Sequence, residues 1–234
     1  YHTQTNMNDF FRMSVDEARR ELGSDTLRGL TQAAALERLA EFGSNQLVES
    51  KKKTYRELFF DQFKNFLIII LLIAALISVL IGEFIDGSFI MFIVLVNAFL
   101  GATQEIQAER EIRALKKMVL PTASVVRDNE IKKIPAAEVV PGDIIILEVG
   151  SAIPADARIV ETANLKVEEA ALTGESAAAL KVATALEGEV PLAERSNMVF
   201  MGTAVVYGRG RAMVTATGMR TELGTIAHLV QSEK

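Results

Sequence analysis

The sequence has 234 residues, of which 50% are hydrophobic, and its formal net charge is −5. An apolar share of this size is high for a soluble domain and indicates that part of the chain lies in lipid. The sequence contains no cysteine, which excludes disulfides, thiolate metal ligands and cysteine nucleophiles. The acidic balance, without a basic stripe, argues against a nucleic-acid partner, and the opening residues do not predict a signal peptide.

The N-terminal region, residues 14–49, is polar and shows helical periodicity. Ser14 is followed three residues later by Glu17, which is the spacing of a capping box at a helix start. A second amphipathic stretch ends at Gly43, which predicts a helix C-cap there. We therefore expect two short cytosolic helices before the basic cluster at residues 51–56.

Two apolar runs follow this region. Residues 66–82 contain no charge, and together with the aromatic residues upstream they reach the length of a membrane span. Those aromatic residues are Phe59, Phe60 and Phe63. The second run, residues 88–102, continues without proline into a polar stretch. This pattern fits a long helix that leaves the bilayer and carries on in water.

Charge places the two runs relative to a membrane. Basic residues flank their outer ends, at Lys51, Lys52, Lys53 and Arg56 and at Arg110, Arg113, Lys116 and Lys117. The connection between the runs, residues 83–87, is acidic. The positive-inside rule therefore puts both ends in the cytosol and this tip outside. A buried helical hairpin in a large soluble protein is the alternative, and the charge asymmetry disfavours it.

After Pro121 the pattern changes to short strands. Residues 122–136 predict a hairpin with its turn at Asp128 and Asn129. Residues 139–150 predict a Pro-Gly-Asp turn followed by a buried strand.

The later part of this region adds further strands and a helix. Strand-like pieces lie between residues 153 and 172. Residues 197–218 predict two strands around a glycine-rich turn at Gly208 and Gly210. A helix is expected from Thr221 to the end of the sequence. Residues 119 to 219 are thus expected to form a small β-rich domain with its own core.

One short motif in this domain suggests chemistry. In the stretch Leu-Thr-Gly-Glu-Ser, a lone acid, Glu175, follows a glycine and lies between the hydroxyls of Thr173 and Ser176. The hydroxyls can hydrogen-bond the carboxylate or cap the turn. A carboxylate presented on such a turn can orient or deprotonate a water. It needs an electrophile from elsewhere, and short motifs of this kind also occur by chance in loops.

The context of the motif resembles a known family. A polar helical start, two apolar spans, a β-rich domain with the motif and a final helix follow one another as in the N-terminal quarter of a P-type cation-transporting ATPase, most closely the calcium-pump-like (type II) branch. The resemblance runs from about residue 28 to the end. It is carried by the stretches GLTQAAALERLAEFGSNQL, FKNFLIIILLIAALISVLIGE, VNAFLGATQEIQAEREIRALKKM, VPGDIIILEVGSAIPAD, VEEAALTGES and NMVFMGTAVVYGRGRAMVTATGMRTELGTIA.

This resemblance implies an α+β membrane protein with a two-helix transmembrane hairpin, a β-rich actuator domain and short N-terminal helices. Four segments are implied. They are N-terminal cytosolic helices packing with the actuator domain (1–56), a transmembrane helical hairpin with a cytosolic extension (57–118), the actuator domain (119–219), and a helical linker toward the next membrane span (220–234).

The resemblance also assigns roles to the motif. In this family the actuator loop docks on an aspartyl phosphate carried by a separate domain. Glu175 is then the catalytic residue that positions and activates the hydrolytic water, and Gly174 allows close approach. Thr173 and Ser176 shape the loop. Hydrolysis of an acyl phosphate depends more on an aligned water than on a strong base.

The sequence departs from the family pattern at two places. Ala177, Ala178 and Ala179 follow the motif where the family usually has a proline, which leaves the rigidity of the loop open. Ala157 stands where glycine is usual after Pro-Ala-Asp, which requires a backbone conformation that tolerates a Cβ atom.

The resemblance implies no cofactor or metal bound by this segment, and ATP and Mg²⁺ for the whole pump. The implied partners are the rest of the pump, with its phosphorylation and nucleotide-binding domains and later spans, the lipid bilayer and the transported cation; no nucleic acid is implied. Calcium is favoured by overall likeness, while protons, sodium and magnesium stay open.

The family's phosphorylation motif, Asp-Lys-Thr-Gly-Thr, is absent from these residues. The chain alone is therefore expected neither to hydrolyse ATP nor to pump, and to be a fragment or one piece of a split pump. The expected location is a bacterial plasma membrane, as a multi-pass protein with its N-terminus and actuator domain in the cytosol. The alternative is a stand-alone membrane-anchored β-domain protein that binds or regulates a partner without catalysis.

Overall fold

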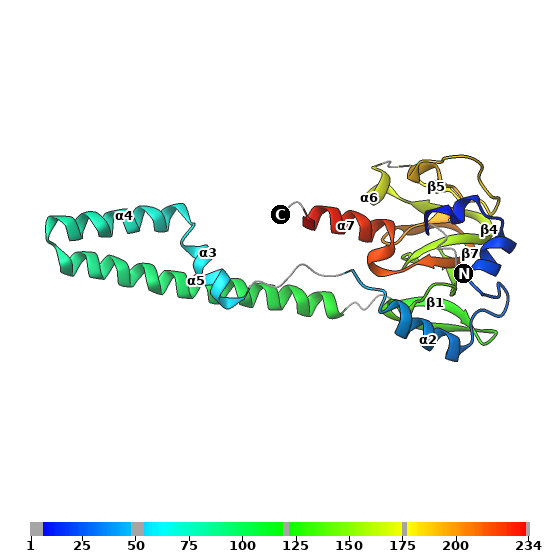
Figure 1. Ribbon diagram of the computed structural model, residues 1–234, viewed down its shortest axis with the longest axis horizontal. Helices are drawn as coiled ribbons and strands as arrows, with labels where there is room; N and C mark the ends of the chain where they lie inside the picture. The colour runs from blue at the N-terminus through cyan, green and yellow to red at the C-terminus, as the bar shows by residue number, and fades with distance from the viewer. Residues whose placement is uncertain (1–6, 48–53, 119–121, 175–176, 233–234) are drawn as a thin grey trace, which may run out of the picture. The chain divides into compact units, whose positions relative to one another are not determined.

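The computed structural model describes residues 7–47, 54–118, 122–174 and 177–232 (Figure 1). The chain divides into two compact units. The first, here called the sheet unit, comprises Tyr1–Val48 and Leu120–Lys234. The second, here called the helical unit, comprises Glu49–Val119.

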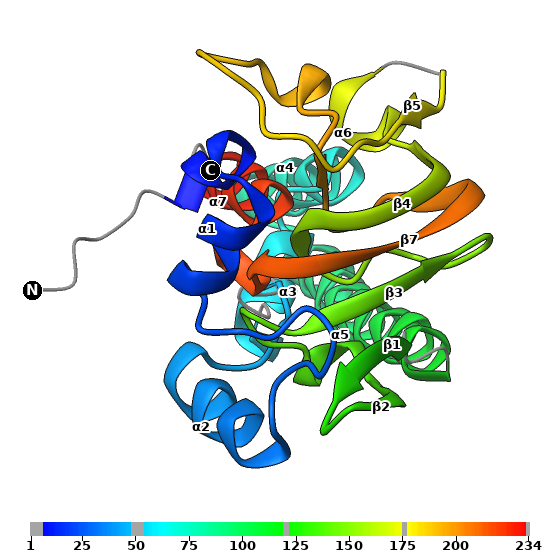
Figure 2. The same ribbon diagram turned by 90° about the vertical axis from the view of Figure 1, so that its right-hand side faces the viewer.

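The sheet unit is built on one seven-stranded sheet (Figure 2). Its strand order is β2-β1-β3-β7-β4-β5, and β6 pairs with β4. All pairings between these strands are antiparallel. The strands are β1 (Thr122–Arg127), β2 (Glu130–Pro135), β3 (Ile144–Glu148), β4 (Asp156–Glu168), β5 (Ala179–Leu180), β6 (Met198–Val199) and β7 (Ala204–Ala216).

The first hairpin forms as the sequence predicts. Asp128 and Asn129 make a two-residue loop with φ of 53° and 65°, the left-handed conformation that a type I′ turn requires at both positions. The register places Arg127 opposite Glu130. The predicted buried strand is β3, and the turn before it contains Gly142 at a φ of 90°.

The predicted glycine-rich turn between two strands is wrong, because β7 runs through both glycines without a break. A Cβ atom on Gly208 would lie 2.2 Å from the carbonyl oxygen of Asn164. One on Gly210 would lie 2.7 Å from the carbonyl oxygen of Glu161. The register of the β4–β7 pair shifts in this stretch. The glycines therefore let two backbones approach closely at bulges and do not reverse the chain.

Both faces of the sheet are buried. Successive residues of β1, β3 and β7 alternate between two apolar clusters, as the two-residue period of a strand requires. One cluster contains Val125, Ile145, Ala212 and Val214, and the other contains Val126, Ile144 and Met213. The second cluster is completed by Phe10, Phe11 and Ala18 from η1 (Met7–Arg12) and α1 (Val15–Glu21).

The helices of this unit begin and end largely where their caps predict. The Ser14 hydroxyl accepts from the N–H of Glu17 at 3.3 Å, and the Glu17 carboxylate accepts from the N–H of Ser14 at 2.8 Å, which confirms the capping box. α2 (Gln32–Phe42) ends at Gly43, whose φ is 78°. The predicted final helix is α7 (Glu222–Ser232).

Arg158 ties the N-terminal segment to the sheet. Its side chain is fully buried on β4 and donates to backbone carbonyl oxygens of Phe10, Met13, Ile159, Ala183 and Asn197 at 2.6–3.3 Å. All of these acceptors are neutral. Burial lowers the pKa of the guanidinium to about 10, which leaves it charged at neutral pH.

The helical unit consists of α3 (Tyr55–Gln62), α4 (Phe66–Ile81) and α5 (Phe84–Met118). α4 and α5 lie side by side (Figure 1). Within the described ranges, one helix is by itself long and apolar enough to cross a membrane, α5 over Phe84–Ala108. α3 and α4 meet the same criterion only together, with a bend of 66° between them. The sequence predicts a hairpin of two membrane spans. One of these has a single helix of sufficient length and hydropathy, so the hairpin is not confirmed.

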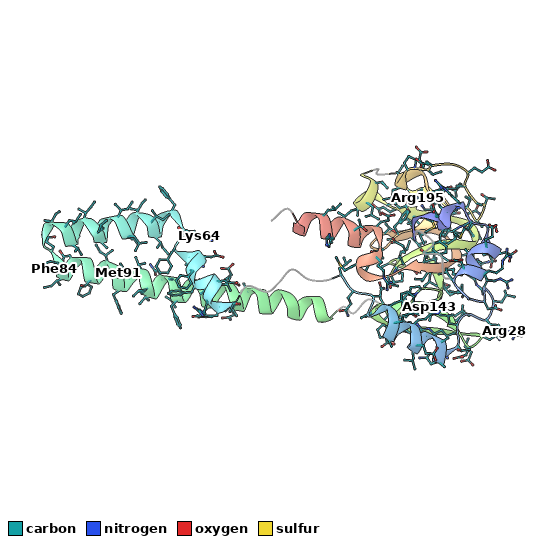
Figure 3. All side chains as sticks on the ribbon, in the orientation of Figure 1. Arg28, Lys64, Phe84, Met91, Asp143 and Arg195 are labelled. Atoms are coloured by element: carbon teal, nitrogen blue, oxygen red, sulfur yellow. The ribbon has the colours of Figure 1, made fainter. Side chains whose placement is uncertain are left out.

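Small side chains line the contact that α5 makes inside the helical unit. Val94, Ala98 and Ala102 are fully buried and recur at intervals of four residues, so they lie on one face of the helix. Small residues allow helix backbones to approach closely. Many apolar side chains of this unit are exposed, among them Phe84 at 66% and Met91 at 39% (Figure 3).

Candidate catalytic loop

The predicted catalytic motif lies in the segment that joins β4 to β5. This segment begins with α6 (Ala170–Thr173), a single helical turn where the sequence predicted a strand-like piece. Gly174 ends the turn at a φ of 75°, the left-handed conformation that glycine adopts most readily. The N–H of Gly174 donates to the carbonyl oxygen of Ala170 at 2.9 Å.

Of the four predicted site residues, the structure places Thr173 and Gly174 next to each other at the end of α6. Glu175 and Ser176 lie outside the described residues. The Thr173 hydroxyl donates to the carbonyl oxygen of Glu169 at 3.1 Å. A Cβ atom on Gly174 would meet none of the described atoms within 4 Å. The backbone conformation, and not a lack of space inside the chain, therefore favours glycine at this position.

The segment returns to the sheet directly after the motif. Ala179 pairs with Val167 and Leu180 pairs with Lys166, both on β4. Ala179 is therefore extended and hydrogen-bonded in β5, although it belongs to the alanine run that replaces the usual proline. Both ends of the segment are fixed to the same strand, and the motif lies between them.

A buried ion pair lies beneath these two ends. Lys181 Nζ is 2.6 Å from Glu169 Oε1, and the two side chains are 1% and 3% exposed. Burial raises the pKa of Glu169 and lowers that of Lys181, while the attraction between them opposes both shifts. The sequence analysis missed this pair, because charged residues beside a loop are ordinarily solvated.

The described residues offer no evident site for a bound metal. No group of three or more histidine, aspartate or glutamate side chains gathers there in a way that could hold a metal ion.

Two family models match the chain. Residues 117–231 match the P-type ATPase actuator domain, and residues 10–78 match the N-terminus of cation transporters and ATPases. The chain belongs to the P-type cation-transporting ATPase family. The first match covers the whole sheet from β1 to β7. The second covers the end of η1, the whole of α1, α2 and α3, and most of α4.

Curated P-type ATPases are similar over nearly the whole chain. Calcium-transporting ATPase 1 of Bacillus cereus is 44% identical over 229 residues, which are 96% of this chain and 26% of the relative. The calcium-transporting ATPase of Bacillus subtilis is 42% identical over 224 residues, 95% of this chain and 25% of the relative. Sodium/potassium exporting P-type ATPase 2 of Saccharomyces cerevisiae is 35% identical over 229 residues, 97% of this chain and 21% of the relative. The chain thus spans about a quarter of the length of the relatives it matches.

The Pro-Ala-Asp stretch of the actuator domain contributes a buried carboxylate. Asp156 accepts hydrogen bonds from the N–H of Met201 at 2.8 Å and from the N–H of Glu222 at 2.7 Å. Burial raises its pKa to about 6, and the nearby Glu222 adds to the shift, whereas the two N–H groups and Arg195 oppose it. Asp156 therefore joins the start of β4 to the start of α7.

The Pro-Gly-Asp turn of the actuator domain also carries a contact that the sequence did not reveal. Asp143 receives two hydrogen bonds from the Arg127 guanidinium, at 2.9 and 2.6 Å, and a third from the N–H of Val140 at 2.9 Å. Both charged side chains are buried. The predicted turn is thus held to β1 by a buried two-point ion pair.

Proposed function

We propose that this chain is the N-terminal segment of an ATP-driven cation pump, with calcium as the transported cation. In this proposal Glu175 orients and activates the water that hydrolyses an aspartyl phosphate, and that phosphate is carried by a domain outside these 234 residues. ATP and Mg²⁺ act at those other domains.

The geometry at the base of the loop supports this role for Glu175. Gly174 takes a left-handed conformation at the end of α6, so the chain turns sharply just before the acid. The Thr173 hydroxyl bonds back to Glu169, and Ala179 is fixed in β5. The described residues on both sides of Glu175 are therefore held in defined positions. Positioning of this kind supplies much of the rate gain in phosphate hydrolysis.

Gly174 supports an approach from outside the chain. Apart from its chain neighbours, no described atom lies within 4 Å of the position that a Cβ atom on Gly174 would take. A partner surface that carries a phosphate could therefore reach this backbone directly, and any side chain here would stand in its way.

The choice of calcium rests on likeness. Four relatives that are 40–44% identical to this chain are named calcium-transporting ATPases, and two at 40% are named probable cation-transporting ATPase F. The yeast sodium/potassium exporter is 35% identical. No ion ligand in the described residues enters this argument.

For the helical unit we propose two membrane spans with the acidic connection outside. α5 is the second span, and α3 with α4 forms the first. α4 alone has 16 residues and is about 24 Å long, which is less than the roughly 30 Å of a bilayer core. The bend at the end of α3 lets the aromatic residues of that helix complete the span near the cytosolic interface.

The deciding experiment begins with the complete reading frame. A continuation past Lys234 that encodes an aspartyl-phosphorylation motif is expected. In the protein from that frame, Glu175→Gln should form the phosphoenzyme from ATP but lose it about 100-fold more slowly after an ATP chase. Glu187→Gln is the matched control, because Glu187 is an exposed acid beyond the same loop.

Two results would overturn the proposal. A reading frame without a phosphorylation motif would leave Glu175 without a substrate in its own protein. Normal decay of the Glu175→Gln phosphoenzyme would remove the role of this carboxylate in the hydrolytic step.

A further inference from the structure

Glu169 and Lys181, which form the buried ion pair, stand at the two ends of the catalytic loop. Glu169 follows the last residue of β4 and precedes α6, and Lys181 follows the last residue of β5. The charged atoms of the pair are 2.6 Å apart. The segment between the two residues, which includes the Thr-Gly-Glu-Ser motif, is thus bridged at its base by this side-chain contact, in addition to the backbone pairing of β4 with β5.

The pair is isolated from other polar groups. Among the described residues no third group hydrogen-bonds to either carboxylate oxygen of Glu169 or to Nζ of Lys181. The centre of the Phe200 ring lies 5.8 Å from Nζ. The charges therefore depend on each other, and removal of one leaves the other buried without a partner.

Isolation of this kind is costly for stability. Two charges lose their hydration when they are buried, and their mutual attraction offsets that cost only in part. Apolar residues of similar volume often replace a buried ion pair with no loss of stability. The net stability of the fold is therefore a poor explanation for this pair, whereas a directional contact between two defined atoms does fix a geometry.

The backbone of Glu169 connects the ion pair to the helical turn α6. Its carbonyl oxygen accepts from the N–H of Leu172 at 2.9 Å, from the N–H of Thr173 at 3.0 Å and from the Thr173 hydroxyl at 3.1 Å. On the other side, the N–H of Lys181 donates to Leu165 of β4 at 2.8 Å. The residue that holds the ion pair is thus the residue on which the helical turn of α6 is built.

We propose that Glu169 and Lys181 are the positioning residues of the catalytic loop, and that their contact sets the direction in which α6 presents Glu175 to the phosphate. This inference rests on the proposed function, since it assigns the pair to the same hydrolytic step. The pair acts through Thr173 and Gly174 and touches neither water nor phosphate.

The test separates positioning from stability by a double-mutant cycle in the protein from the complete reading frame. The variants are Glu169→Gln, Lys181→Met and the two combined. Three quantities are measured for each: the melting temperature, the hydrogen exchange of backbone amides in residues 172–180, and the rate of phosphoenzyme decay. Asp143→Asn is the control, because it breaks another buried ion pair of the same sheet.

Each single variant leaves a buried charge unpaired, so its melting temperature should fall by roughly 6–20 °C. The combined variant removes both charges and should regain most of that loss. Its loop amides should nevertheless exchange at least about 10-fold faster than in the original protein, and its phosphoenzyme should decay about 10- to 100-fold more slowly. The Asp143→Asn control should lose stability without faster exchange in residues 172–180.

The outcomes distinguish the two proposals. If the combined variant recovers loop exchange and decay together with stability, the pair only balances its own buried charges and the positioning role is wrong. If loop exchange rises in the combined variant but Glu175→Gln decays normally, the pair does position the loop and the proposed function of Glu175 fails. If Glu175→Gln decays slowly and the pair variants leave the loop and the decay unchanged, the positioning role alone fails.

Discussion

The carboxylate of Asp156 accepts a hydrogen bond from the N–H of Glu222 at 2.7 Å, 66 residues further along the chain. Its other oxygen accepts from the N–H of Met201 at 2.8 Å. One side chain at the start of β4 therefore holds the first turn of α7 and the end of the β6 region. Because this carboxylate is buried, the contact depends on its protonation.

We expect the stability of the protein to fall as pH rises through the pKa of Asp156. Burial raises that pKa to about 6, whereas an unfolded chain has about 3.9. The folded state then binds the proton more tightly, so the stabilising contribution is complete below pH 4 and is lost by pH 6 to 7. The loss corresponds to about 3 kcal/mol. To measure this loss, the unfolding free energies of the original protein and of Asp156→Asn are determined at several pH values. The difference between the two proteins should change with pH by this amount.

Asp25 provides a control of opposite sign. The N–H groups of Arg28 and Leu27 hold the pKa of Asp25 below its usual value. The stability that this carboxylate contributes is therefore lost as pH falls. If the difference in unfolding free energy between the original protein and Asp156→Asn is the same at every pH, the prediction for Asp156 is contradicted.

Replacement of Arg158 by lysine should destabilise the sheet unit by about 3 kcal/mol or more. A lysine keeps the charge but cannot reach the carbonyl groups that the guanidinium joins at 2.6–3.3 Å. Buried carbonyls would lose their donors, and the N-terminal segment would lose an anchor. Chemical denaturation measures the loss, and faster proteolysis before residue 15 reports the release. Arg209→Lys, at an exposed position of β7, is the control, and its unfolding free energy should stay within about 0.5 kcal/mol of that of the original protein.

Gly29 and Gly43 should differ sharply when each is replaced by alanine. Both have a positive φ, of 69° and 78°, so each substitution carries a backbone cost of about 1–3 kcal/mol. At Gly29 a Cβ atom would also lie 1.8 Å from the carbonyl oxygen of Val126, whereas at Gly43 it would meet none of the described atoms within 4 Å. Gly29→Ala should therefore cost at least about 2 kcal/mol more than Gly43→Ala. Equal unfolding free energies for the two variants would show that the N-terminal segment does not pack on β1 in this way.

The absence of cysteine makes the proposed membrane topology directly measurable. Single cysteines are introduced at Glu83, in the acidic connection, and at Asp128, in the β1–β2 turn. In intact cells a membrane-impermeant maleimide should label the first variant, and it should label the second only after permeabilisation. Labelling of both from the same side would contradict the two-span arrangement.

Local patterns predicted much of the sheet unit because a few neighbouring residues determine them. The capping box of Ser14 and Glu17 and the turn at Asp128 and Asn129 depend on hydrogen bonds and backbone angles within four residues. The role of Gly208 depends instead on Asn164, on another strand. Sequence reasoning treated that glycine as a turn, although a glycine inside an apolar stretch also signals a bulge or a close backbone approach.

The candidate site was likewise predictable only in part from the sequence. The residue types of the motif, and the family that they resemble, were readable from the sequence. The one helical turn of α6 and the ion pair of Glu169 with Lys181 were not, because nothing near either residue indicates that its charge becomes buried. That burial follows from packing in which Phe200 also takes part, and this residue comes late in the chain.

The sheet unit is assembled from two stretches of chain with the helical unit inserted between them. Phe10, whose carbonyl oxygen binds Arg158, is synthesised 148 residues earlier than its partner. At a synthesis rate of about 5–20 residues per second, it waits roughly 7–30 s for that partner to be made. During this time the apolar face of η1 and α1 has no sheet to cover. Folding of the sheet unit in the cell therefore requires that this small hydrophobic segment stay soluble until the sheet has been synthesised. A chaperone at the ribosome is suited to this task.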